Sequence, residues 1–274
     1  MNSVLHSQKN YLRFKGVVLT AISIIVLLNH NTTAAPKAVI VSEEEQTERA
    51  PLSYHTETKG GVILHLVSFD SRDYRLKVID QVNGPGSEWR DSATLGKSKG
   101  ALAVINAGFF TPEGKPLGRL IAQGKTRGYN NPSSLGSGFL YQCKSHSGIA
   151  RRSSLTSFVK RHKPSELLQT GPMLSYRGST VKGLSSTRPR PRSFIASNGS
   201  HHWLIGYAEN ATLSQLSAAL SGKSVGGVKV FHAINLDGGG STALWFDGRI
   251  RNRPSDWTER SIADALLVFP PEST

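Results

Sequence analysis

Short apolar runs of strand length, many of them bounded by glycine, recur along the chain from residue 60 to residue 269. They are rich in Val, Ile, Phe, Tyr and Trp, whose side chains suit the pleated surface of a sheet. The clearest helix is expected at residues 212–222, where Thr212 is a suitable N-cap and Gly222 a C-terminal stop. Because the runs do not alternate regularly with helices, the pattern predicts an α+β fold: a mixed, strand-rich sheet flanked by a few short helices in a single domain.

The expected elements follow from these runs. Strands are expected at residues 60–70, 74–80, 101–106, 133–143, 171–179, 193–199, 202–209, 228–236, 241–249 and 261–269. A short helix is expected between residue 89 and the strand at 101–106. One or two short helices are expected at residues 154–169, with Pro164 at a helix start. The Asn-Gly pair at 198–199 predicts a turn between two strands.

The first 35 residues have the three parts of a secretory leader. A basic start with Lys9, Arg13 and Lys15 precedes the uncharged apolar run at 16–28, and small residues follow at 33–35. A membrane-spanning helix needs about 20 apolar residues, so this run is short for a permanent anchor. The pattern predicts a signal peptide over residues 1–35, with an uncleaved signal anchor as the alternative. In either case the protein is expected to be exported.

The rest of the chain is expected to form a tether and one domain. Residues 36–56 are mostly polar and charged, which predicts a flexible tether, and residues 57–274 are predicted to form the folded domain. A chain of this length can bury one good core. Its single cysteine, Cys143, excludes an internal disulfide. An exported protein without disulfides suits the periplasm or cell envelope of a bacterium.

The charge is basic and spread along the chain. Without the first 35 residues, 30 Lys and Arg stand against 19 Asp and Glu, a net charge of +11. The densest basic clusters are at 150–154, 159–163 and 188–192. They indicate either a solvated surface or attraction of anionic envelope material such as phosphate-bearing glycans or lipid head groups. Export and the lack of an aromatic-rich binding module argue against nucleic acid. Membrane contact is expected only through the leader.

Several common motifs fail on inspection. The GKS and GKT triplets at 96–98, 124–126 and 222–224 lack the earlier glycine that a phosphate-binding loop requires. The G-x-S-x-G pattern at 222–226 follows a helix, whereas a nucleophile elbow follows a strand. His201 and His202 would face opposite sides of a strand, so turn residues are the better interpretation. With no zinc or calcium motif, no metal site or cofactor is predicted, although a divalent cation is left open.

The segment INLDGGGSTALWF, residues 234–246, places one carboxylate after an apolar run and follows it with three glycines and two hydroxyls. Glycine is costly to order, so three in a row belong where the backbone turns sharply or lets a partner approach closely. One interpretation is a hairpin turn in which Asp237 serves the turn itself. The other is a binding site built around Asp237.

Other glycine-marked segments favour the second interpretation. AVINAGFF at 103–110, LQTGPML at 168–174 and RPRSFIA at 190–196 also bring an apolar strand against polar and small residues. Asn106 and Asn235 occupy matching places, each after an apolar run that ends in Ile. Strand ends of this kind present side chains and backbone N–H groups to a ligand.

These segments resemble, in order and over roughly residues 60–270, the phosphodiester glycosidases related to the uncovering enzyme of the mannose-6-phosphate pathway. The most specific element is NLDGGGST, and NAGFF, PLGRLI at 116–121, TGPML, PRSFIA and RSIADALLVF at 260–269 fill the remaining places. Two departures are Ala107, where the family has glycine, and Ser193, where it has threonine. Both replacements are small, and Ser193 keeps the hydroxyl. The resemblance implies hydrolysis of a sugar joined through its anomeric carbon to a phosphodiester.

The residues suit that chemistry. The substrate is anionic and its anomeric carbon becomes cation-like in the transition state, so cations and a carboxylate are needed. The catalytic residues predicted are Asp237, Arg192 and Asn106, with Asp237 as nucleophile or base. Guanidinium groups bind phosphate through parallel hydrogen bonds. Further substrate-binding residues predicted are Gly108, Phe109, Arg119, Gly171, Asn235, Gly238, Gly239, Gly240, Ser241, Thr242 and Arg260. A second carboxylate is Glu113, Asp247, Asp256 or absent, with Glu113 favoured.

The sequence is therefore compatible with three classes of function. The first is an exported hydrolase acting on a sugar 1-phosphodiester in phosphorylated glycans or on related sugar phosphates. The second is a non-catalytic protein of the same fold that binds envelope glycans. The third is a basic structural protein of the envelope, which would tolerate alanine at Gly238–Gly240. The sequence does not identify the sugar or its aglycone.

Overall fold

The computed structural model describes residues 51–81, 91–251 and 264–270, which all fall in one compact unit spanning Thr47–Thr274. The predicted leader and residues 36–50 of the predicted tether lie outside the described residues. Residues 53–56, the end of that tether, already belong to the first strand. Within the described ranges, no helix has the length and apolar character needed to cross a membrane.

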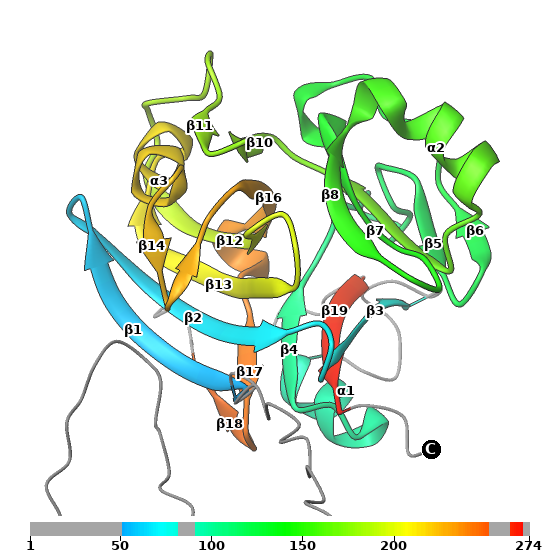
Figure 1. Cartoon of the computed structure of the whole chain (residues 1–274), viewed down its shortest axis with the longest axis horizontal. Helices are drawn as coiled ribbons and strands as arrows, with labels where there is room; N and C mark the ends of the chain where they lie inside the picture. Colours follow the sequence, from blue (N-terminus) through cyan, green and yellow to red (C-terminus); the bar gives the residue numbers. More distant parts are fainter. Residues whose placement is uncertain (1–50, 82–90, 252–263, 271–274) are drawn as a thin grey trace, which may run out of the picture. The chain divides into compact units, whose positions relative to one another are not determined.

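Most strands form three antiparallel sheets (Figure 1). Sheet A has the order β1 (Ser53–Lys59), β2 (Val62–Asp70), β13 (His202–Ala211), β12 (Arg190–Ser197), β16 (His232–Gly238), β10 (Met173–Tyr176), β11 (Ser179–Thr180). Sheet B has the order β18 (Arg249–Ile250), β17 (Leu244–Phe246), β4 (Ala103–Asn106), β19 (Asp264–Phe269), β3 (Arg75–Asp80). Sheet D has the order β6 (Lys125–Arg127), β5 (Leu120–Ala122), β9 (Glu166–Thr170), β7 (Gly138–Gln142), β8 (Ser147–Arg151). A small hairpin pairs β14 (Ser224–Val225) with β15 (Val228–Lys229).

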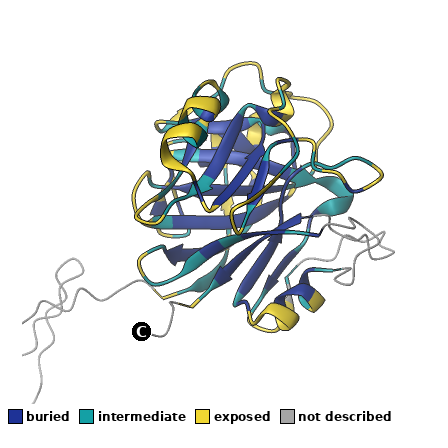
Figure 2. Ribbon diagram, turned by 90° about the vertical axis from the view of Figure 1, so that its right-hand side faces the viewer, coloured by how far each residue is buried: buried dark blue, intermediate teal, exposed yellow. Residues whose placement is uncertain are grey.

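All three sheets contribute to one central core. Strand residues alternate between the two faces of a sheet, so each strand can serve two clusters. In β2, Val67 and Phe69 belong to the central core, whereas Leu64 and Leu66 pack on the opposite face. The central core also holds residues from sheets B and D, among them Ile105, Leu266, Leu140 and Leu168. Figure 2 shows the strands as the most deeply buried part of the unit.

Each helix covers the outer face of one sheet. α3 (Leu213–Leu220) buries Leu216 and Leu220 against sheet A, and α1 (Ser92–Lys99) buries Leu95 in a cluster with residues of sheet B. α2 (Leu155–His162) packs Leu155 with residues of sheet D. Helices of eight residues are marginal alone, so this packing stabilises them. Gly96 lets α1 approach sheet B, because a Cβ there would lie 2.7 Å from the Trp245 ring.

The α+β class, with many strands and few short helices, is confirmed. The expected mixed sheet is replaced by several sheets, and every pairing between described strands is antiparallel. The helix expected over 212–222 is present, with Thr212 and Gln215 forming a capping box. The prediction of a helix that starts at Pro164 was wrong, because residues 166–170 form β9, which is buried between β5 and β7. Burial in the sheet overrides the helix propensity of Glu, Leu and Gln.

Candidate active site

The end of β4 meets the end of β16, and the side chain of Asn106 joins them. Its Nδ2 donates to the backbone carbonyl of Asp237 at 2.7 Å. Its Oδ1 accepts from the Ser193 hydroxyl at 2.6 Å and from the Ala243 N–H at 3.1 Å. Asn106 is almost fully buried, so these bonds replace all contact with water. Asn106 therefore fixes β4, β12 and both flanks of the triple glycine in one arrangement.

Asp237 lies at the end of β16 with a partly buried side chain. Its Oδ1 accepts a hydrogen bond from the Gly238 N–H at 2.8 Å. Burial raises the pKa of this carboxyl, and this effect outweighs the hydrogen bonds from Ser241 and Gly238 and the charge of Arg190. Because desolvation makes the ionised form costly, this carboxylate is reactive toward positive charge or a proton.

A second acid, Asp264, is buried and lies close enough to Asp237 for the charge of Asp237 to raise the pKa of Asp264. Asp264 opens β19, and its Oδ1 accepts from the Gly108 N–H at 2.6 Å. Burial raises its pKa to about 7; the charges of Asp80 and Asp237 add to this, and the Gly108 hydrogen bond and the charge of Arg127 oppose it. The site thus contains two carboxyl groups with raised pKa, of which Asp264 is the more buried.

Two glycines allow the close approach of the strands at this site. A Cβ on Gly108 would lie 3.0 Å from Leu168 and 3.1 Å from the Asp264 carboxyl. A Cβ on Gly238 would lie 2.7 Å from the Pro191 carbonyl oxygen. Ala107 stands where the family has glycine, and its methyl group fits because it is buried in the central core. Gly108 and Gly238 are therefore needed for close packing of the chain at this site.

The TGP segment is fixed to β16 through Asn235. The Asn235 Nδ2 donates to the Gly171 carbonyl at 3.1 Å, and the Thr170 hydroxyl donates to the Asn235 carbonyl at 3.0 Å. Asn235 is buried, as is Thr242, whose N–H donates to the Gly239 carbonyl at 3.2 Å. The side chains of Asn235 and Thr170 therefore hold the backbone of the site from inside the protein. Gly240 lies in the short 3₁₀ turn Gly239–Ser241.

Arg192 and Arg190 differ in their exposure and in the groups on which they act. The Arg192 guanidinium donates to the carbonyls of Ala211 and Arg188, both at 3.2 Å. Burial, and then the charge of Arg190, lower its pKa. The exposed Arg190 is the arginine whose charge acts on Asp237, and its side chain lies 3.7 Å from a Cβ built on Gly239. Arg260 lies outside the described residues.

The remaining predicted residues are Phe109 and the candidates for a second carboxylate. Glu113 is exposed in the turn after β4, where a hydrogen bond from Thr111 is the largest cause of its lowered pKa. Asp247 is exposed in the turn between β17 and β18, and Asp256 lies outside the described residues. Phe109 is partly buried, and its carbonyl accepts from the Leu117 N–H at 2.8 Å. The described residues hold no cluster of three or more His, Cys, Asp or Glu suited to a metal ion.

Gln169, which the sequence interpretation passed over, links the segments around Arg119. Its Oε1 accepts from the N–H groups of Arg119 at 3.0 Å and Asn131 at 2.9 Å. Its Nε2 donates to Asn130 Oδ1 and to the carbonyls of Asn131 and Gly136, each at 2.9 Å. Gln169 is buried, so these bonds satisfy the whole amide.

Replacing Gln169 with Leu is expected to destabilise the protein by about 3 kcal/mol, because several buried polar groups lose their partner at once. The free energy of unfolding from urea titration measures this effect. Gln142→Leu, in the neighbouring strand β7 and partly exposed, is the matched control and should change stability by less than about 1 kcal/mol. Equal stability of Gln169→Leu and the wild type would contradict the structural role.

Three residues of the site were missed from the sequence, and each had a signal. Asp264 is the single carboxylate of the apolar strand DALLVF, and Gln169 lies in ELLQT before the TGP segment. Arg190 lies in the basic cluster 188–192, two positions before the arginine that was chosen. A polar residue inside a buried strand, or beside a site, is a candidate for a specific hydrogen bond or charge.

Comparison with known proteins places this arrangement in a family. A family model described as phosphodiester glycosidase matches residues 99–269, more than half of the chain. The catalytic domain of zebrafish N-acetylglucosamine-1-phosphodiester alpha-N-acetylglucosaminidase is similar in fold, with a TM-score of 0.59, 19% identity, and coverage of 81% of this chain and 83% of that one. A hypothetical protein from Synechocystis has a TM-score of 0.52, 17% identity, and coverage of 80% and 61%.

At these identities the solved structures support the fold alone. A search of curated protein sequences found no significant match. The family match covers NAGFF, TGPML, PRSFIA and NLDGGGST, the segments on which the resemblance was based, together with Asn106 and Asp237. The resemblance is therefore confirmed: the chain belongs to the phosphodiester glycosidase family.

Proposed function

We propose that this protein is an exported hydrolase that cleaves the bond between the anomeric carbon of a sugar and the oxygen of a phosphodiester. Water adds across this bond, so the products are a free sugar and a phosphate monoester. The observation that carries the proposal is Asp237, a carboxylate with raised pKa on a glycine turn, beside the exposed Arg190 and the buried Asp264.

Each group has a defined task in this proposal. The Asp237 carboxylate supplies the negative charge that a cation-like anomeric carbon needs, as nucleophile or as base for water. Arg190 is exposed and electrostatically coupled to Asp237, so it is better placed than Arg192 to bind phosphate oxygens. Asn106 and Ser241 orient the Asp237 segment, through its backbone carbonyl and its carboxyl respectively. Asp264 holds the Gly108 backbone against β19.

Substrate and location are part of the proposal. The basic surface and the predicted leader favour a phosphorylated glycan or sugar phosphate of the periplasm or cell envelope. The zebrafish protein of similar fold is named for a sugar 1-phosphodiester, which supports the same substrate class here.

A substrate with two distinguishable cleavage products tests the proposal. The protein is incubated with p-nitrophenyl phosphodiesters of hexose 1-phosphates and N-acetylhexosamine 1-phosphates. Cleavage at the anomeric carbon gives free sugar and p-nitrophenyl phosphate, which is the expected result. Release of p-nitrophenol with a sugar 1-phosphate would overturn the proposal in favour of a phosphodiesterase. Saturable binding of these compounds without any product would overturn it in favour of a glycan-binding protein.

A further inference from the structure

A separate cavity of about 380 Å³ lies between three connections of the fold. They are the turn after β2, the hairpin between β7 and β8, and the loop between β12 and β13, represented by Arg72, Lys144 and His201. Phe69 and Trp203, both nearly fully buried, are part of its lining. Cavities of 300–1,000 Å³ are typical of small-molecule sites, so this one suits a ligand about the size of a single sugar.

The cavity is distant from Asp237. Strand β12 carries Arg192, which pairs with Gly238, at one end and Ser197, which pairs with His232, at the other. The loop that lines the cavity follows Ser197. Five residue steps along a strand span about 17 Å, so the two places lie at opposite ends of sheet A. A ligand of single-sugar size in the cavity therefore does not reach the proposed active site.

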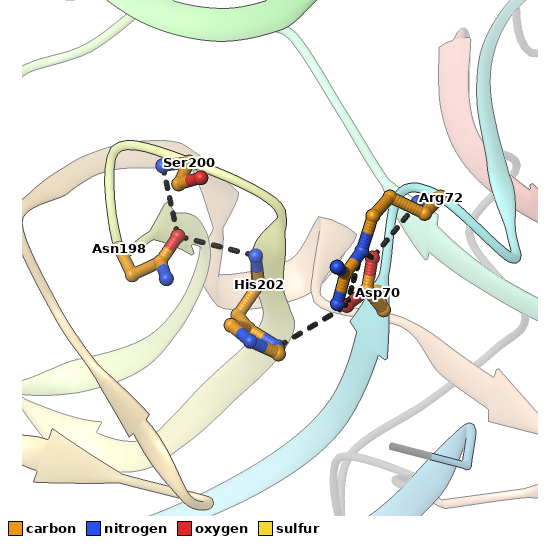
Figure 3. Close-up of polar contacts among 5 residues, drawn as sticks. All are labelled: Asp70, Arg72, Asn198, Ser200 and His202. Carbon is orange, nitrogen blue, oxygen red and sulfur yellow. Dashed lines mark hydrogen bonds and ion pairs between the residues drawn. The ribbon is translucent and has the colours of Figure 1, made fainter. Parts of the chain in front are cut away.

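Arg72, which lines the cavity, forms an ion pair with the buried Asp70 carboxylate. Figure 3 shows this pair. The Asp70 carboxylate is fully buried and accepts from Arg72 Nη2 at 2.6 Å, from Arg72 Nε at 3.0 Å and from the Arg72 N–H at 2.8 Å. Burial alone would raise the pKa of Asp70, but the hydrogen bonds and charge of Arg72 lower it, so this group is ionised at neutral pH. The pair uses Nε and Nη2, and the half-exposed guanidinium keeps Nη1 for another partner.

The neighbouring loop is fixed to the turn that carries Arg72. The Ser71 N–H donates to the His201 carbonyl at 2.8 Å, and His202 Nδ1 lies 3.6 Å from the Asp70 carboxylate. Asn198 Oδ1 accepts from the N–H groups of Ser200 at 2.9 Å and His202 at 3.1 Å, as Figure 3 shows. The four-residue connection therefore has a set shape, where the sequence predicted only a simple Asn-Gly turn.

The lining is rich in hydrogen-bond donors. It contains no Asp or Glu, and Arg72, Lys144, His146 and His201 lie in it. The charges of Asp70 and Asp73 act on Arg72 from behind the lining, so Lys144 is the cation of the lining that lies apart from these acids. Hydroxyl groups are supplied by Ser71, Ser145, Ser147 and Ser200. Guanidinium, ammonium and hydroxyl donors suit phosphate oxygens, and hydroxyls also bind sugar oxygens. Tyr74, partly buried, adds aromatic surface to which a sugar ring can pack.

We propose that this cavity binds a phosphorylated monosaccharide unit, as a second saccharide site remote from Asp237. The phosphate contacts Lys144 and the Nη1 edge of Arg72, and the sugar ring lies against Tyr74 and the serine hydroxyls. This inference does not rest on hydrolysis at Asp237, because it follows from the donor groups, the aromatic surface and the size of the cavity. A non-catalytic protein with the same cavity would bind the same ligand.

Isothermal titration with glucose 1-phosphate, glucose and inorganic phosphate tests the proposal. The wild-type protein is expected to bind glucose 1-phosphate more tightly than either of the others. Lys144→Ala is expected to weaken this binding about tenfold, since one charge-assisted hydrogen bond is lost. Arg72→Lys keeps a charge beside Asp70 but loses the planar donor edge, and is expected to weaken binding as well.

Two controls separate this site from the proposed active site. Lys125→Ala removes an exposed lysine from β6, away from the lining, and should leave the affinity unchanged. Asp237→Asn changes the proposed active site and should retain the binding that Lys144→Ala weakens. Unchanged affinity in both Lys144→Ala and Arg72→Lys would overturn the proposal, as would loss of binding in Asp237→Asn alone. Equal affinity for inorganic phosphate would overturn the saccharide assignment and leave a simple anion site.

Discussion

Replacing Asp237 with Asn is expected to lower kcat for cleavage of a sugar 1-phosphodiester by about 10³-fold or more, the scale of losing a group that stabilises transition-state charge. The amide has nearly the same shape, and its Oδ1 can still accept the hydrogen bond from the Gly238 N–H. What it lacks is the negative charge and the capacity to accept a proton or attack carbon. Release of free sugar, followed over time at saturating substrate, measures the change.

The fold should survive this substitution. Burial raises the pKa of Asp237, which means that the ionised form is costly in the folded state. A neutral amide avoids that cost, so the midpoint of thermal unfolding is expected to stay the same or to rise. Asp247→Asn is the matched control, because it removes an exposed carboxylate ten positions later and should leave kcat unchanged. Full activity in Asp237→Asn would show that another group performs the reaction.

Several elements of the fold could be predicted because their patterns are local. The run at 101–106 and the helix at 212–222 carry their own signals, and both occur as β4 and α3 within one or two residues. The number of sheets and their antiparallel pairing were not predictable in this way. Such pairings join residues far apart in the sequence, such as Ala265 with Asn106. Residues 166–170 show the same limit, since β5 and β7 on either side determine their strand conformation.

The residues of the candidate site also fall into two groups: those that a local sequence pattern reveals and those that depend on contacts between distant parts of the chain. Asn106 and Asp237 were found because each follows an apolar run and precedes small residues, and the structure brings the Asn106 amide to the Asp237 backbone. Which arginine acts on Asp237 depends on the bulged pairing of β12 with its neighbours near Arg192, and no sequence period reveals a bulge. Asp264 was passed over because its role depends on a contact with Gly108, 156 positions earlier.

Asp264 should make stability depend on pH in a defined direction. In the unfolded chain its pKa is close to the ordinary 3.8, and in the folded protein it is about 7. Between these values the folded state binds more protons than the unfolded state, so this group's contribution to stability falls as pH rises from about 4 to about 7. Above pH 7 both states are ionised at this group, and the contribution no longer changes.

Asp264→Asn is expected to remove this dependence. The amide oxygen can accept the Gly108 N–H, and the amide carries no charge near Asp80 and Asp237. Relative to the wild type, the variant should gain stability from pH 4 to pH 7, with an upper limit of about 4 kcal/mol, and keep that gain at higher pH. The free energy of unfolding from urea titrations between pH 4 and pH 9 measures the difference.

The comparison isolates Asp264 because the other titrating groups are the same in both proteins and largely cancel in the difference. Asp247→Asn, which removes an exposed carboxylate, should give a profile parallel to that of the wild type. Parallel profiles for the wild type and Asp264→Asn would mean that the Asp264 carboxyl is ionised throughout this range.

The raised pKa of Asp264 also has a consequence for Asp237. Below pH 7 a protonated Asp264 adds no negative charge near Asp237, so Asp237 ionises more readily than it would next to a carboxylate. Activity that depends on ionised Asp237 should therefore extend to lower pH than two adjacent carboxylates would allow.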